Sequence, residues 1–126
     1  MTENVWLWIA QGLLAALFGA AGVTKAMLPM PRLVAMMDWT GAVPVALTRL
    51  IGVAELAAAV AMVLPIALDI LPWLTPLAAL GLIAIQLVAI GFHLRAGETL
   101  KSLPMNLLLG ALAAFVLWGR FDLFGV

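Results

Sequence analysis

The chain of 126 residues contains no cysteine and no tyrosine, and its single histidine is His93. The lack of cysteine excludes disulfides, thiolate metal ligands and thiol–disulfide redox chemistry by this chain alone. The lack of tyrosine excludes acid–base chemistry at a phenol side chain. With one histidine and no thiolate, we expect no bound metal. No catalytic motif is recognisable either, so the sequence favours a protein that is not an enzyme, although it leaves enzymatic activity open.

Charge is also scarce. Charged residues make up 10% of the sequence, and six basic residues balance six acidic ones. This balance lacks the basic surface that nucleic-acid binding needs. By contrast, 67% of the residues are hydrophobic, and the mean hydropathy is +1.24. Such a composition is typical of an integral membrane protein, so the lipid bilayer is the first expected partner.

Apolar segments separated by prolines or polar residues predict four transmembrane helices in one domain, residues 1–126. The predicted helices cover residues 5–26, 45–64, 73–92 and 104–119. About 20 residues suffice to cross a hydrocarbon core about 30 Å thick, and the fourth helix is short for a span. Backbone polar groups in lipid must be hydrogen-bonded within the protein, which excludes open strands. The predicted fold is therefore an all-α, polytopic, antiparallel four-helix bundle.

The connections between these helices differ in character. Residues 27–44 contain three prolines, and they predict a short interfacial or re-entrant helix near residues 32–39, with Pro31 in its first turn. Residues 66–72 predict a short turn, and residues 93–103 predict a polar loop. The first helix is preceded by no basic residue, unlike a signal peptide, so we expect it to be retained as a membrane span.

The placement of basic residues predicts the orientation of the bundle. One side holds Lys25, Arg32, Arg49, Arg95 and Lys101. The other side holds Arg120 alone, together with an aromatic belt of Trp6, Trp8, Trp73 and Trp118. Because cytoplasmic loops carry an excess of lysine and arginine, both termini are predicted to lie on the outer side.

Small residues recur at four-residue spacing along the predicted helices, as at Gly12, Ala16 and Ala20. Such faces allow membrane helices to approach closely. They favour packing within the bundle, and a homodimer interface is the alternative. Gln11, near the outer end of the same helix, is expected to help hold the packed helices together.

The candidate site is an intramembrane polar cluster: Lys25, Arg49, Glu55, Gln86, His93 and Asn106. A charge near the bilayer centre costs roughly 2.5–3.5 kcal/mol on insertion scales, so such residues mark the places where function is expected. Lys25, Arg49, His93 and Asn106 fall near helix ends on one side of an up-down bundle. Glu55 lies about 15 Å from the start of its helix, since each residue rises 1.5 Å. These positions predict a polar funnel that opens to the inner side, with Glu55 and Gln86 at its floor.

Arg49 and Glu55 are six residues apart on one helix, so they do not form an ion pair of the i,i+3 or i,i+4 kind. Each is expected to find partners on other helices: Lys25 or His93 for Glu55, and Glu98 or Asp38 for Arg49. A protonated Glu55 is the alternative, since burial raises the pKa of a carboxyl group.

Each polar residue also has a structural interpretation. Lys25 and Arg49 can reach the interface along their aliphatic stems. His93 can be an interfacial polar residue, and Gln86 a hydrogen-bonding residue between helices. Glu55 is the residue for which a functional or partner-binding role is favoured, because no side chain reaches water from the middle of the membrane.

The residues carry a recognisable pattern. The first helix ends in FGAAGVTK, the second begins with RLIGVAEL, the third ends in AIGFH and the fourth opens with PMNLLL. In this pattern, over nearly its whole length, the chain resembles the DoxX-like family of small four-helix membrane proteins. The resemblance implies a protein of the bacterial inner membrane and a link to a membrane-bound thiosulfate:quinone oxidoreductase. A similar eukaryotic branch, the NACHO-type receptor-assembly chaperones, assists the assembly of pentameric ligand-gated channels.

Two functions follow as hypotheses. The first, which we rank higher, is a non-enzymatic scaffold or assembly chaperone for other membrane proteins, whose polar cluster shapes the bundle or receives a partner helix. The second is an accessory subunit of a membrane redox complex that binds a quinone or another lipid-soluble molecule. In that case Glu55 and His93 exchange protons, while Arg49 and Lys25 steer the polar head of the ligand. No cofactor other than a quinone is expected.

Overall fold

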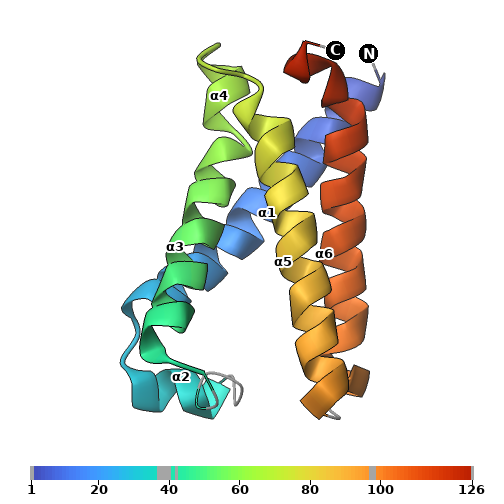
Figure 1. Cartoon of the computed structure of the whole chain (residues 1–126). Helices are drawn as coiled ribbons and strands as arrows, with labels where there is room; N and C mark the ends of the chain where they lie inside the picture. The colour runs from blue at the N-terminus through green and yellow to red at the C-terminus, as the bar shows by residue number, and fades with distance from the viewer. Residues whose placement is uncertain (1, 37–40, 42, 97–98, 126) are drawn as a thin grey trace.

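The computed structural model describes residues 2–36, 41, 43–96 and 99–125, and gives the backbone alone for residues 2–3, 92–96 and 99–103. Every regular element within these residues is a helix (Figure 1). The elements are α1 (Thr2–Met27), α2 (Met30–Met36), α3 (Val45–Ala61), α4 (Leu64–Ala67), α5 (Leu74–Ala96), α6 (Thr99–Gly119) and the 3-10 helix η2 (Phe121–Phe124). The predicted all-α class is confirmed for this part of the chain.

Among the described residues, three helical segments are long and apolar enough to cross a membrane: Asn4–Met27, Val45–Ala67 and Leu74–Gly91. The second of these combines α3 and α4. The apolar part of α6, Pro104–Gly119, is shorter than the other three. The chain is thus a multi-pass membrane protein, while a fourth crossing by α6 stays a prediction.

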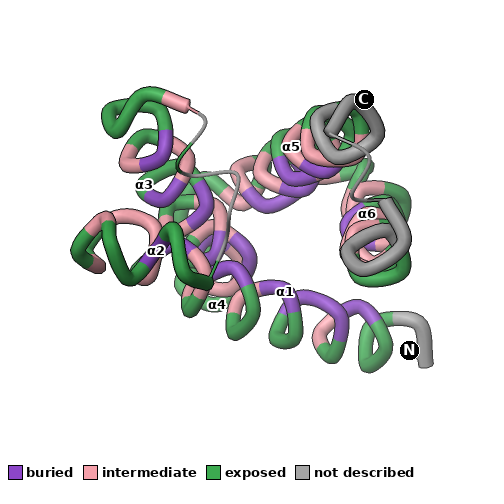
Figure 2. The backbone as a smooth tube through the Cα atoms, turned by 90° about the horizontal axis from the view of Figure 1, so that it is seen from below, coloured by how far each residue is buried: buried purple, intermediate pink, exposed green. Residues whose placement is uncertain are grey.

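The long helices α1, α3, α5 and α6 run alternately down and up in Figure 1. Both chain ends therefore lie at one end of the molecule, and α2 lies at the other. The most extensive pairings are α1 with α3 and α5 with α6. These two pairs meet near the chain ends and diverge toward α2 (Figures 1 and 2).

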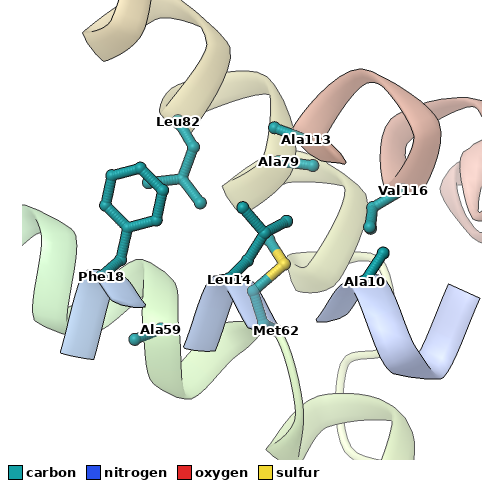
Figure 3. Packing of buried hydrophobic residues seen from close by; sticks show 9 residues of the cluster. All are labelled: Ala10, Leu14, Phe18, Ala59, Met62, Ala79, Leu82, Ala113 and Val116. Carbon is teal, nitrogen blue, oxygen red and sulfur yellow. The ribbon is translucent and has the colours of Figure 1, made fainter. Parts of the chain in front are cut away.

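The apolar core lies in the half of the bundle near the chain ends. It consists of Ala10, Leu14, Phe18, Ala59, Met62, Ala79, Leu82, Ala113 and Val116. Figure 3 shows the α1 members of this cluster pointing toward those of α5 and α6. Large apolar side chains such as Leu50, Val53 and Leu87 are exposed on the outside, where lipid tails are as apolar as they are. Among the described residues, this core does not extend into the half of the bundle near α2.

The predicted polar loop at residues 93–103 is wrong. The helix α5 continues to Ala96 and α6 begins at Thr99, so Pro104 lies inside α6 and not at its start. The predicted helices 73–92 and 104–119 are correspondingly too short at these ends. Arginine, lysine and glutamate are good helix formers, so charge at the interface does not end a membrane helix.

The predicted helix 45–64 is interrupted instead of continuous. Pro65 has no N–H to donate to the carbonyl of Ala61, and α3 ends there. The Thr75 hydroxyl donates to this carbonyl at 2.6 Å, and Gln11 Nε2 donates to the carbonyl of Met62. Two buried side chains thus replace the missing main-chain hydrogen bonds, as a membrane interior requires.

The first connection contains the predicted short helix. It begins slightly earlier than expected, because α2 covers Met30–Met36, and Pro31 lies in its first turn as predicted. Leu33 of α2 is fully buried. The remainder of the predicted segment, residues 37–39, lies outside the described residues.

Candidate functional site: a cleft between two helix pairs

The helices α1 and α3 touch backbone to backbone at two glycines, Gly22 and Gly52. A Cβ atom on Gly52 would lie 2.6 Å from the main-chain nitrogen of Ala26. A Cβ atom on Gly22 would lie 2.7 Å from the main-chain oxygen of Gly52. No side chain fits at these distances, so the pair forms a close helix crossing that only glycine permits.

An ion pair between Lys25 and Glu55 spans this crossing. Each residue follows one of the two glycines by three positions, which places it on the same face one turn further along. Lys25 Nζ lies 2.6 Å from Glu55 Oε1, and the two side chains are 13% and 2% exposed. Lys25 is therefore confirmed as a partner of Glu55, and its alternative interpretation as a side chain that reaches away to the interface is wrong.

Arg49 acts on the end of α1. Its Nη1 donates to the main-chain oxygen of Lys25 at 3.0 Å. Because α1 ends at Met27, this oxygen is one of the last four of the helix, which lack a partner within it. A cation also suits the negative end of the helix dipole. Arg49 thus caps α1, and its predicted partners, Asp38 and Glu98, lie outside the described residues.

A cleft of about 490 Å³ lies between the two helix pairs, on the α2 side of the core. Its volume is within the range of roughly 300–1,000 Å³ that is usual for small-molecule sites. Most of its walls are apolar. The lining residues are Leu17, Phe18, Ala21, Lys25, Val43, Leu47, Ile51, Glu55, Ala84, Ile85, Gln86, Val88, Ala89, Asn106 and Leu109.

Polar groups face each other across this cleft. Lys25 and Glu55 belong to the wall formed by α1 and α3, whereas Gln86 and Asn106 belong to the wall formed by α5 and α6. Gln86 Oε1 and Asn106 Nδ2 are buried and have no hydrogen-bond partner among the described atoms. A buried polar group without a partner costs about 1–3 kcal/mol. A polar group placed beside either atom would gain a hydrogen bond.

The cleft brings together Lys25, Glu55, Gln86 and Asn106 of the predicted polar cluster, although its walls are mostly apolar and Arg49 is not among its lining residues. Phe18 belongs to both the core and the cleft lining, so it marks the inner end of the cleft. Glu55 and Gln86 are also buried lining residues, and their place at the floor of a funnel stays a prediction. The side chain of His93 lies outside the described residues, so its membership of the cluster stays a prediction.

The profile of the DoxX-like family matches residues 9–116. The chain belongs to the DoxX-like family. The match includes the glycine crossing, the ion pair and every residue that lines the cleft. No curated protein and no solved structure matches the chain.

The structure explains the motif spacing in this DoxX-like chain. The G-x-x-K of the first helix and the R-x-x-G-x-x-E of the second are the two halves of one helix crossing. The glycines bring the backbones together, Lys25 meets Glu55, and Arg49 reaches the end of α1. The motif is therefore a structural unit that forms one wall of the cleft.

A second polar group, missed in the sequence, closes the end of the DoxX-like bundle near the chain ends. Arg120 Nε donates to Gln11 Oε1 at 2.9 Å, and Arg120 Cζ lies 5.5 Å from the centre of the Trp8 ring. Burial lowers the pKa of the Arg120 guanidinium, and the Asp122 carboxylate acts in the opposite direction. The Gln11 amide thus links α1 to the end of α3 and to Arg120. The sequence feature that could have revealed this polar group is Pro65. A proline leaves main-chain carbonyl groups of the preceding turn without their usual N–H donors, so side chains such as Gln11 have to donate instead.

Proposed function

We propose that this DoxX-like protein binds a lipid-soluble molecule in the cleft and acts as an accessory subunit of a membrane redox complex. The observation that carries this proposal is the cleft, with its volume of about 490 Å³ and its mostly apolar walls. Sites of this kind bury the apolar body of a ligand, while a few polar groups fix its head. A quinone, with a small oxygenated ring on a long apolar tail, has the corresponding shape.

In this proposal, the polar residues at and near the cleft have different roles in binding. Lys25, Glu55, Gln86 and Asn106 supply polar contacts to the head of the ligand. Arg49 supports the site through its cap on α1, in place of the steering role expected from the sequence. Proton exchange by Glu55 and His93 remains part of the proposal.

The proposed setting is the bacterial inner membrane, with α6 as a fourth crossing and both termini on the outer side. The shared position of the chain ends supports this arrangement (Figure 1). So do Trp6, Trp73 and Trp118, which are exposed at helix ends on that side of the molecule. Tryptophan is enriched at such positions because its ring suits the membrane–water interface.

The test is binding of a benzoquinone that carries a ten-carbon tail to the protein in lipid nanodiscs, measured by the shift in thermal unfolding. The variant Ala84→Phe fills the cleft without changing its polar groups, since Ala84 is a lining residue. We expect it to abolish the shift that the wild type shows. The matched control Ala111→Phe places the same ring on an exposed site of α6 outside the lining and is expected to bind normally. Absence of binding to the wild type by this probe in both its oxidised and its reduced form would overturn the proposal.

The second candidate function is that of a scaffold or assembly chaperone, in which the cleft receives a helix of a partner protein. It is favoured by the divergence of the two helix pairs, which pack within themselves more than against each other. Photo-crosslinking from position 84 in native membranes separates the two candidates. Crosslinks to another protein support the scaffold, crosslinks to a second copy of the chain support a homodimer, and crosslinks to lipid-soluble material alone support ligand binding.

A further inference from the structure

The α5–α6 wall of the cleft carries an unsatisfied donor and an unsatisfied acceptor. Gln86 Oε1 can only accept a hydrogen bond, and Asn106 Nδ2 can only donate one. Both atoms lack a partner among the described residues, and the Gln86 side chain is only 5% exposed. In an otherwise apolar wall, the two atoms define which head group fits.

The two amides belong to one stripe of facing positions. A Cβ atom on Gly110 would lie 3.9 Å from the Gln86 Cβ, so Gly110 faces Gln86 across the α5–α6 contact. Asn106 precedes Gly110 by four residues, which places it on the same face of α6, one turn nearer the opening. The terminal torsions of asparagine and glutamine side chains have broad preferences. Each amide therefore turns toward the cleft at low cost.

We propose that the cleft selects amphiphiles whose neutral head carries a hydroxyl group, such as a phenol, a hydroquinone or an alcohol. One hydroxyl group both donates and accepts, so it can satisfy Gln86 Oε1 and Asn106 Nδ2 together. A head with acceptors alone, such as an oxidised quinone or an ether, leaves Gln86 Oε1 unpaired. This inference rests on the proposed binding of a lipid-soluble molecule and adds the chemistry of its head group.

The experiment compares 4-octylphenol with its methyl ether, 4-octylanisole, on the protein in nanodiscs. The two probes differ only in the hydroxyl proton, which a methyl group replaces. We expect the phenol to bind about tenfold more tightly after correction for partition into protein-free nanodiscs, because a buried acceptor left unpaired costs this much or more. Equal affinities would overturn the inference while leaving ligand binding itself intact. Absence of binding by both probes and by the benzoquinone would overturn the proposed function as well.

Variants then assign a role to each amide. Gln86→Leu is expected to remove the preference for the phenol while the ether still binds. Asn106→Leu removes a donor that can serve the oxygen of either probe, so it is expected to weaken both probes and to keep the preference. The matched control is Thr48→Val, because Thr48 Oγ1 is also buried without a partner but Thr48 does not line the cleft. That variant should keep the preference. A preference that survives in Gln86→Leu would contradict the proposal, and the comparison of probes on the wild type stands even if a variant fails to fold.

Discussion

Lys25 and Glu55 show how a buried charge is compensated by a single partner inside this bundle. Placing an ion in an apolar interior carries a penalty of several kcal/mol, which a good partner offsets. Glu55 is only 2% exposed, and its Oε1 lies 2.6 Å from Lys25 Nζ. Arg49 adds a hydrogen bond to the main chain of the same lysine. The pair thus joins α1 to α3 beside the cleft and leaves the opposite wall to neutral amides.

Removal of the lysine charge tests this account. Lys25→Met leaves the Glu55 carboxylate buried without this cation, and we expect a loss of about 3–5 kcal/mol in the free energy of unfolding. Addition of Glu55→Gln to that variant removes the buried charge and should recover part of the loss. The measurement is denaturant or thermal unfolding in mild detergent. Arg32→Met, at an exposed position of α2, is the matched control and should change little. Purely additive effects of the two substitutions would contradict the assigned interaction.

At the scale of helices, the close α1–α3 crossing depends on two residues that have no side chain, Gly22 and Gly52. Gly22 and Gly52 lie so close that the main chains themselves are in contact. In a membrane there is little hydrophobic drive between helices, so close packing supplies much of their association. The same approach brings Lys25 within reach of Glu55. A small change in the spacing of these two helices therefore alters both the packing and the ion pair.

Substitution of these glycines should be far more damaging than substitution elsewhere in the same bundle. Gly52→Ala inserts a methyl group where backbone atoms lie 2.6 Å and 2.8 Å away. We expect a loss of about 1–3 kcal/mol or more in stability. Gly81→Ala is the matched control, because no atom lies within 4 Å of its added Cβ. That control should be neutral or slightly stabilising, since alanine favours helix more than glycine does. Equal melting temperatures for the two variants would be inconsistent with the crossing.

The break between α3 and α4 is a second feature at this scale. Pro65 leaves the carbonyl of Ala61 without its usual donor, and the Thr75 hydroxyl takes that place. The hydrogen bond joins the end of α3 to the first turn of α5. It therefore also holds the two helix pairs together on the side opposite the cleft opening.

Thr75→Val preserves the shape of this side chain and removes its hydroxyl group. The Ala61 carbonyl then stays buried without a donor, and we expect a loss of about 1–3 kcal/mol in the free energy of unfolding. Thr75→Ser retains the hydroxyl group and should lose less. Both variants are compared by thermal unfolding in the same detergent. If valine and serine at this position are equally stable, the hydrogen bond contributes nothing.

At the scale of the whole molecule, the packed core and the cleft occupy different halves of the described bundle. The apolar core and the Gln11–Arg120 contact lie near the chain ends, and the cleft lies toward α2. With the predicted orientation, the cleft lies in the cytoplasmic half of the bundle. A ligand or partner would then enter from that leaflet or from the cytoplasm.

The absence of cysteine makes this orientation directly measurable. Single cysteines at Asp69, Asp122 and Arg32 supply exposed sites in the α4–α5 turn, in η2 and in α2. A membrane-impermeant maleimide applied to intact spheroplasts should label the first two variants and not the third. Permeabilised cells, in which all three should react, are the control. Labelling of Asp69→Cys and Asp122→Cys from opposite sides would overturn the four-span arrangement.

Much of the fold was predictable because lipid restricts the backbone so strongly. Long apolar segments had to be helices, and the prolines at residues 44 and 65 marked breaks correctly. The extension of α5 to Ala96 and the start of α6 at Thr99 were missed, because polar residues were taken to end a helix although arginine and lysine are good helix formers. At the site, the pairing of Lys25 with Glu55 could be expected from their depth, as one of two choices. The carbonyl partner of Arg49 could not, since it depends on where α1 ends relative to α3.

The sequence by itself determined the membrane class, the helical fold and which polar residues lie deep, because each follows from composition and from distance along a helix. Only the tertiary structure decided which side chains meet and which remain without partners. The separation of six positions from Arg49 to Glu55 excluded a pair within one helix, but the backbone contact of Gly22 and Gly52 selected Lys25. The cleft likewise exists only because two helix pairs diverge, and a divergence between helices is a property of packing that no local pattern encodes.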